Sequence, residues 1–114
     1  MDAALLLEAR ALVLADLEAR GLAAPEAVNK LEDAVSERGW WAEQWPEGAE
    51  YVAGLVAQDV QDALLELGSR WPLCRECGSG TPAHQLYISP DLGGPDPVWV
   101  CEESGRAVAP LGGL

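Results

Sequence analysis

Four side chains of the kinds that bind transition metals lie close together near the end of the chain. Cys74, Cys77 and Cys101 are its three cysteines, and His84 is its single histidine. Cys74 and Cys77 form a C-x-x-C pair followed by Gly78, a spacing at which two thiolates point at one tetrahedral ion and glycine permits the tight turn. The four residues together predict a structural Cys3His site for one zinc ion.

Other chemistry for the same side chains is less well supported. A redox dithiol at Cys74 and Cys77 would be typical of a thioredoxin-like βαβ unit, which the sequence does not predict. Three unrelated thiols and a surface histidine are a further alternative. A catalytic zinc keeps one position open for water, and a deaminase needs H-x-E before P-C-x-x-C, whereas His84 follows the cysteine pair. We therefore expect a protein that is not an enzyme.

The fourth ligand has two kinds of candidate. His84 completes the set by type, but Glu102 and Glu103 directly follow Cys101 and would replace the imidazole if it points away. Residues 72–114 contain few large apolar side chains. A metal ion would therefore supply folding free energy that so short a segment lacks.

The charge of the chain argues against polyanionic partners. The formal net charge is −12. Residues 1–70 hold five Lys and Arg against fourteen Asp and Glu, and residues 71–114 hold two against five. Nucleic acids and anionic membranes attract clustered Lys and Arg, so we expect neither as a direct partner.

The N-terminal residues do not resemble a targeting or membrane segment. Asp2, Glu8 and Arg10 interrupt the apolar run at the start of the chain, and no basic region or small-residue cleavage site is present. Three cysteines without a secretory signal favour reduced thiols over a disulfide framework. We expect a cytoplasmic protein.

Apolar periodicity predicts three helices before the cysteines. The first covers residues 2–21 and has two apolar faces, because Leu7 and Leu14 lie off the broad stripe that contains Val13 and Leu17. The second covers residues 25–38, from a proline to the glycine at position 39. The third begins at residue 46 or 47 and ends at 67, with its glutamines, including Gln61, largely off the apolar face.

The remaining residues predict short strands. Residues 85–89 and 98–101 form a hairpin with a long turn, and residues 107–111 are a third extended piece beside it. The fold class expected is α+β, mostly α. It comprises a three-helix bundle over residues 1–70 and a zinc-stabilised β-hairpin over residues 71–114, docked on the third helix through Trp71 and Trp99.

The five tryptophans divide into two groups. With no Phe and two Tyr in the chain, tryptophan has to supply most of the bulky packing, which favours a core position for Trp71 and Trp99. Trp40, Trp41 and Trp45 lie in residues 39–46, a segment predicted to be a loop. Tryptophan is enriched at interface hot spots. We expect one of these three in the core and one or two to contact a partner.

The C-terminal segment resembles the zinc-ribbon ends of small uncharacterised actinobacterial proteins. The resemblance rests on the C-x-x-C-G motif, His84, the strand end at Trp99 and Cys101, and the closing residues 107–114. It covers about 40 of the 114 residues. A standard ribbon has a second C-x-x-C after the hairpin, whereas Cys101 stands alone. The resemblance implies a zinc-ribbon-like fold and no particular activity, since such modules serve several roles.

These features favour a non-enzymatic zinc-binding adaptor or assembly subunit that acts through protein–protein contacts. Its partners would be other protein chains, which include further copies of itself or a larger assembly. The alternative is a regulator of transcription or translation whose zinc ribbon contacts a nucleic acid or a polymerase. A C-x-x-C redox protein is a third possibility.

Overall fold

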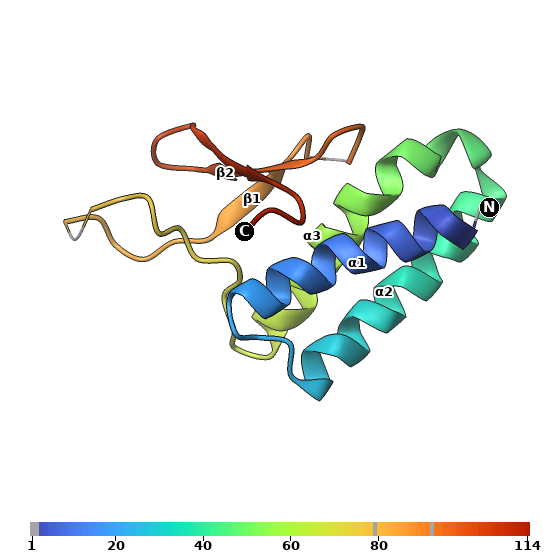
Figure 1. The fold of residues 1–114 in the computed structure, drawn as a ribbon, viewed down its shortest axis with the longest axis horizontal. Helices are drawn as coiled ribbons and strands as arrows, with labels where there is room; N and C mark the ends of the chain where they lie inside the picture. Colours follow the sequence, from blue (N-terminus) through green and yellow to red (C-terminus); the bar gives the residue numbers. More distant parts are fainter. Residues whose placement is uncertain (1–2, 79, 92) are drawn as a thin grey trace.

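The computed structural model describes residues 3–78, 80–91 and 93–114. Three helices pack together, and a three-stranded sheet lies over α1 and α3, with α2 on the far side of the bundle (Figure 1). The predicted mostly-α α+β fold is confirmed. The elements in chain order are α1 (Ala3–Ala19), α2 (Pro25–Gln44), the 3-10 helix η1 (Pro46–Tyr51), α3 (Val52–Glu66), β1 (Leu86–Ser89), β2 (Val98–Cys101) and β3 (Ala107–Pro110).

Helix α1 buries one apolar face fully and the other only in part, where Leu14 packs against the core. Ala9, Val13 and Leu17 are fully buried, whereas Leu7 is 66% exposed. The chain leaves the helix at Gly21, whose φ of 70° is a left-handed conformation that glycine adopts without strain. Of the two residues that define the second predicted face, Leu7 is therefore uncovered and Leu14 is partly covered.

Helix α2 is longer than its sequence predicted, and residues 40–44 are helical rather than a loop. Gly39 does not end the helix. A Cβ at this position would lie 3.1 Å from Leu6 Cδ1, so the glycine allows α1 to approach α2 closely. The helix stops before Pro46, because proline has no N–H for the helical ladder.

The third predicted helix is present, but its first turns are the 3-10 helix η1. Its apolar stripe is buried as the periodicity indicated, with Val52, Val56 and Val60 fully inaccessible. Gln61 is a correction, since it is buried rather than on the solvent face. Its Nε2 donates hydrogen bonds to the carbonyl oxygens of Trp71 and Leu86, at 3.0 and 2.9 Å. This glutamine therefore joins α3 to the strand region.

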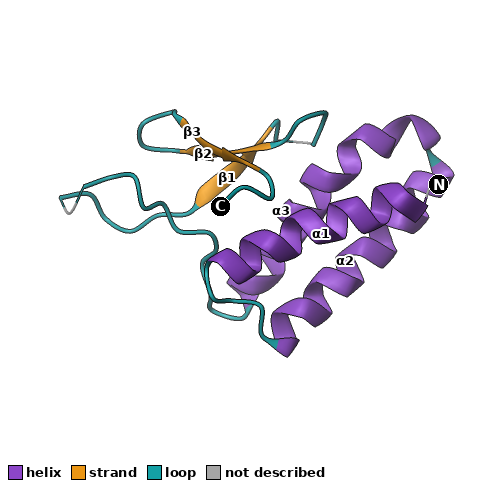
Figure 2. Ribbon diagram, in the orientation of Figure 1, coloured by secondary structure: helices purple, strands orange, loops and turns teal. Residues whose placement is uncertain are grey.

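The sheet is antiparallel with the order β1-β2-β3. The predicted hairpin is confirmed, with Leu86 opposite Cys101 and Ser89 opposite Val98. The third extended piece pairs with β2, and the register shifts between Trp99 and Val100. The loop before β1 and the β2–β3 turn extend beyond the helices at the end away from the N-terminus (Figure 2). This extension contains the cysteines and the histidine.

The sheet docks on α1 as well as on α3. Trp71 and Trp99 are fully buried and meet edge to face, with ring centroids 5.3 Å apart. The Nε1 of Trp99 donates to Asp16 Oδ2 at 2.8 Å, and the Nε1 of Trp71 donates to the Asp16 carbonyl at 3.3 Å. The two rings therefore lie in the core as expected, but their polar anchor is on the first helix rather than the third. One hydrophobic cluster contains residues from both sides of position 70.

Candidate metal centre

One long loop and one strand end bring the four predicted ligands together. Cys74 and Cys77 lie in the loop that precedes β1, His84 lies just before β1, and Cys101 is the last residue of β2. The Cys74 amide donates to the His84 carbonyl at 2.8 Å, which ties the cysteine loop to the chain entering β1. The pairing of Leu86 with Cys101 then places the strand end beside the loop.

The ligand atoms form one compact group. The Cys77 Sγ lies 3.9 Å from Cys74 Sγ, 3.6 Å from Cys101 Sγ and 3.8 Å from His84 Nε2. The distance from His84 Nε2 to Cys101 Sγ is 3.4 Å. All four ligand atoms lie within 4.8 Å of one another. The group is thus placed to bind one metal ion.

The imidazole of His84 is oriented by the backbone. Its Nδ1 donates a hydrogen bond to the Pro82 carbonyl at 2.8 Å. This bond turns Nε2 toward the thiols, where it would coordinate a metal ion once its proton is displaced, the orientation that most metal-binding histidines use. His84 points toward the thiols and is a member of the group, as the sequence predicted for the fourth position.

Cys101 is held by the turn that follows β2. The Ser104 amide donates to its Sγ at 3.4 Å, and the Gly105 amide donates to its carbonyl at 2.8 Å. The turn therefore directs an N–H toward the sulfur, as half of a zinc-ribbon knuckle does. Glu102 and Glu103 are exposed on this turn and are not members of the ligand group.

The hydrogen bonds within and around the group shift the pKa values of its members in different directions. Hydrogen bonds from Ser104, followed by that from His84, lower the pKa of Cys101 to about 6. The hydrogen bond to the Pro82 carbonyl, with that to Cys101, raises the pKa of His84 to about 9. The hydrogen bond with Cys101, together with desolvation, raises the pKa of Cys77 to about 12. A metal ion would displace protons from these groups when it binds.

A buried carboxylate that the sequence reasoning missed connects the metal-binding region to the helices. Asp16 is fully buried on α1. In addition to the hydrogen bond from Trp99, its carboxylate accepts hydrogen bonds from two amides of the C-terminal tail. The Gly112 amide donates to Oδ2 at 2.6 Å and the Leu114 amide to Oδ1 at 2.9 Å. One signal was present in the sequence, because Asp16 interrupts the apolar stripe of Val13 and Leu17.

The other predicted contact residues lie at the opposite end of the fold from the metal group. Trp40 is 66% exposed, Trp45 is 45% exposed and Trp41 is half-buried. The rings of Trp41 and Trp45 meet edge to face at 5.3 Å, and Trp45 stacks on Tyr51 at 5.7 Å. Arg38 lies over the Trp41 ring at 5.5 Å. We call Trp40, Trp41 and Trp45 the aromatic surface.

Comparison with known proteins places the chain in one family. The family model described as "Domain of unknown function (DUF8819)" matches residues 2–111, and the chain therefore belongs to this family. Searches of curated proteins and of solved structures found no significant match. Among the described residues, no helix combines the length and the apolar character that crossing a bilayer requires.

Proposed function

We propose that this protein is a non-enzymatic adaptor or assembly subunit with a structural zinc ion, and that its aromatic surface contacts another protein chain. The observation that carries the proposal is an exposed tryptophan on a helix, Trp40, near two packed tryptophans in the sequence. Trp40 projects from α2 next to Trp41 and Trp45, whose rings pack on each other and on Tyr51. Aromatic anchors of this kind dominate the binding free energy of many interfaces.

Zinc is the metal that best suits the ligand group. A tetrahedron with Zn–S bonds of about 2.3 Å has S···S edges of roughly 3.8 Å. The distances of Cys77 Sγ to Cys74 Sγ and Cys101 Sγ are 3.9 and 3.6 Å. Four protein ligands fill the tetrahedral shell, so the site suits a structural role rather than activation of water. The turn after Cys101, which directs the Ser104 amide toward the sulfur, favours a zinc-ribbon-like module.

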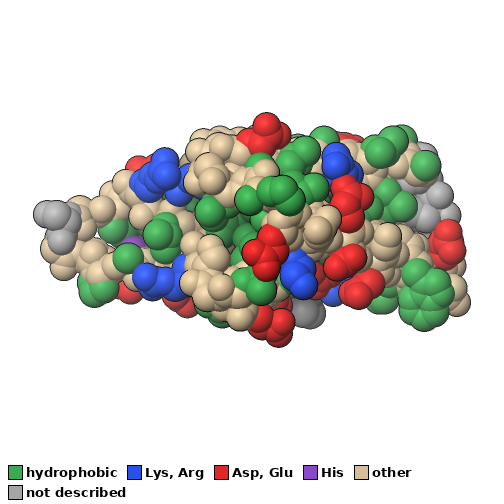
Figure 3. Space-filling view, turned by 90° about the horizontal axis from the view of Figure 1, so that it is seen from below, with side chains coloured by type: hydrophobic (Ala, Val, Ile, Leu, Met, Phe, Trp, Pro, Cys, Tyr) green, Lys and Arg blue, Asp and Glu red, His purple; other side chains and the backbone are tan. Residues whose placement is uncertain are grey.

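The surface of the helical end supports a protein partner. The face seen in Figure 3 exposes hydrophobic side chains at that end, interspersed with acidic ones. An apolar patch within an acidic surface suits a partner that is itself apolar and basic at the contact. The cytoplasmic location remains part of this proposal.

The regulator alternative has weaker support. Arg70, Arg75 and Arg106 are exposed around the strand region, but Arg70 already donates to the Ala83 carbonyl at 3.1 Å. Binding to a phosphate backbone depends on clustered cations. With a net charge of −12, the chain as a whole repels such a ligand.

The test pairs metal analysis with affinity capture from extracts of the source cells. We expect one equivalent of zinc in protein purified without added metal, and a captured partner that Trp40→Ala loses. Leu65→Ala is the matched control, because Leu65 is 51% exposed at the far end of α3. Equal capture by the wild type and both variants, or a protein that forms no complex with itself or others, would contradict the proposal.

A further inference from the structure

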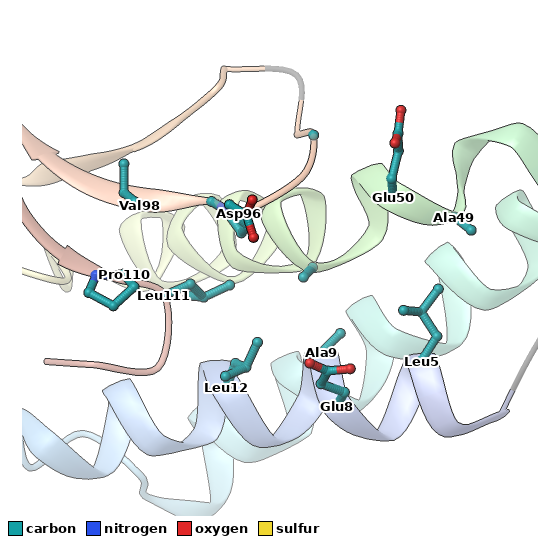
Figure 4. A pocket seen from close by; sticks show the side chains of 13 residues that line it. Leu5, Glu8, Ala9, Leu12, Ala49, Glu50, Asp96, Val98, Pro110 and Leu111 are labelled. Atoms are coloured by element: carbon teal, nitrogen blue, oxygen red, sulfur yellow. The ribbon is translucent and has the colours of Figure 1, made fainter.

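A cavity of about 300 Å³ lies between the first half of α1, the start of α3 and the chain that enters β2 (Figure 4). Leu5, Leu12 and Leu111 line its apolar part, together with Pro97 and Pro110. This volume is at the lower limit of small-molecule sites, which span roughly 300 to 1,000 Å³. The cavity therefore suits one long side chain better than a cofactor.

Three carboxylate residues also line this cavity. Figure 4 shows the side chains of Glu8 on α1 and Asp96 before β2 beside the space between these elements, whereas the side chain of Glu50 points away from α1. Within residues 3–78, 80–91 and 93–114, none of the three has an ion pair, and no Lys or Arg lines the cavity. The cavity is therefore apolar inside, and among the described residues the carboxylates at its opening have no positively charged side chain beside them. We call this cavity and its opening the groove.

The wall that contains Asp96 packs closely on neighbouring backbone. Gly93 has a φ of 79°, and a Cβ there would lie 2.5 Å from the Tyr51 carbonyl oxygen. On α3, a Cβ at Gly54 would lie 3.0 Å from Gly93 Cα. The Leu111 amide also donates to the Pro97 carbonyl at 2.9 Å. These close contacts join the segment of Asp96 to α3 and to the chain after β3, which reduces the ordering cost of binding.

We propose that this groove binds a lysine side chain presented by a partner protein. The aliphatic stem of lysine would lie along the leucines while its ammonium reaches the carboxylates of Glu8 and Asp96, the usual arrangement for this amphipathic side chain. The net charge of −12 attracts a basic segment from a distance. The inference rests on the proposed adaptor function in one respect, since it names the chemistry of a partner segment.

The direct test is an NMR titration of the full-length, metal-loaded protein with two capped peptides. Acetyl-Ala-Lys-Ala-amide carries the ammonium, and acetyl-Ala-norleucine-Ala-amide has the same aliphatic stem without it. We expect the lysine peptide to shift the amide resonances of α1 residues 5–12 and of residues 93–98. It should bind about tenfold more tightly than the norleucine peptide, because loss of one charge-assisted hydrogen bond weakens binding by about that factor. Equal affinities, or shifts spread over the whole acidic surface, would overturn the proposal.

Charge-neutral variants locate the binding site. The double variant Glu8→Gln and Asp96→Asn should weaken binding of the lysine peptide about tenfold. Asparagine suits position 96, because Asp96 has a φ of 53° and asparagine tolerates this left-handed region. Glu18→Gln removes the same charge from the exposed far end of α1 and should bind the peptide as the wild type does. Equal weakening by Glu18→Gln would assign the effect to general charge attraction and refute the groove.

Two further controls distinguish other occupants. If n-butylamine binds as tightly as the lysine peptide, the groove is a small-amine site and the protein partner is excluded. If the protein self-associates and Lys30→Met abolishes this, the occupant is a second copy of the chain. Trp40→Ala should leave peptide affinity unchanged, since Trp40 does not line the cavity. A failed titration therefore leaves the capture experiment at the aromatic surface intact, and a failed capture leaves the titration intact.

Discussion

The helical and the metal-binding regions are ordered by different forces. In the helices, regularly spaced apolar side chains meet in a common core, as Val13, Leu31 and Val56 do. In residues 71–114, three strands of four residues each are joined by loops, and four ligand-type side chains meet at the tip. The comparison shows that burial of apolar side chains is enough to order long helices with periodic apolar residues. A short segment rich in loops needs a few strong, specific contacts in addition.

Removal of one metal ligand should produce the largest effect. Cys101→Ser is expected to release the metal ion and disorder the loop around Cys74 and Cys77, because binding in such sites contributes on the order of 10 kcal/mol to folding. The helical circular dichroism signal should largely persist. Elemental analysis and amide NMR spectra measure the two effects, with Glu103→Gln as the neighbouring control. Loss of all helical signal would show instead that the two regions fold only as one unit.

Asp16 is expected to rank second, because it links the two regions. Asp16→Ala leaves the buried Trp99 N–H and two tail amides without their acceptor, which should lower the free energy of unfolding by about 3 to 5 kcal/mol. Asp16→Asn keeps one acceptor oxygen and should cost less. Chemical denaturation followed by tryptophan fluorescence measures both. A loss below about 1 kcal/mol for the alanine variant would mean that solvent replaces the carboxylate without cost.

Gln61 provides a milder test of the same link. Gln61→Leu keeps the size of the side chain but removes the donor to the carbonyls of Trp71 and Leu86. We expect a loss of about 2 kcal/mol in the free energy of unfolding, measured by urea denaturation. The exposed neighbour Asp62 serves as control, and Asp62→Asn should stay within about 0.5 kcal/mol of the wild type. If the two variants are equally stable, the hydrogen bonds of Gln61 do not contribute to holding the two regions together.

The smallest effect is expected within the bundle. Arg38 donates two hydrogen bonds to the Asp59 carboxylate, at 2.7 and 2.9 Å, and these raise the pKa of Arg38. Arg38→Lys keeps the charge but loses the paired geometry, and should lower the free energy of unfolding by about 1 kcal/mol. Thermal unfolding at low and high salt measures this. A larger loss than that of Gln61→Leu would contradict the view that burial dominates in the bundle.

Part of the fold followed directly from local patterns. The stripe of Val52, Val56 and Val60 predicts α3 without knowledge of its neighbours, and the C-x-x-C-G motif identifies two ligands from spacing alone. Segment ends were harder to predict. Gly39 continues α2 because Leu6 of another helix packs against it, and a local glycine rule has no information about that contact.

The sequence by itself determined the element types and the four side chains able to hold a metal, because helical periodicity and ligand chemistry are properties of residue type and spacing. The tertiary structure decided how distant residues meet. It brought His84 to the thiols, placed Asp16 beneath the C-terminal tail, and set Glu8 opposite Asp96 across a cavity. These outcomes depend on how α1 and the sheet pack together, which a local sequence pattern does not encode.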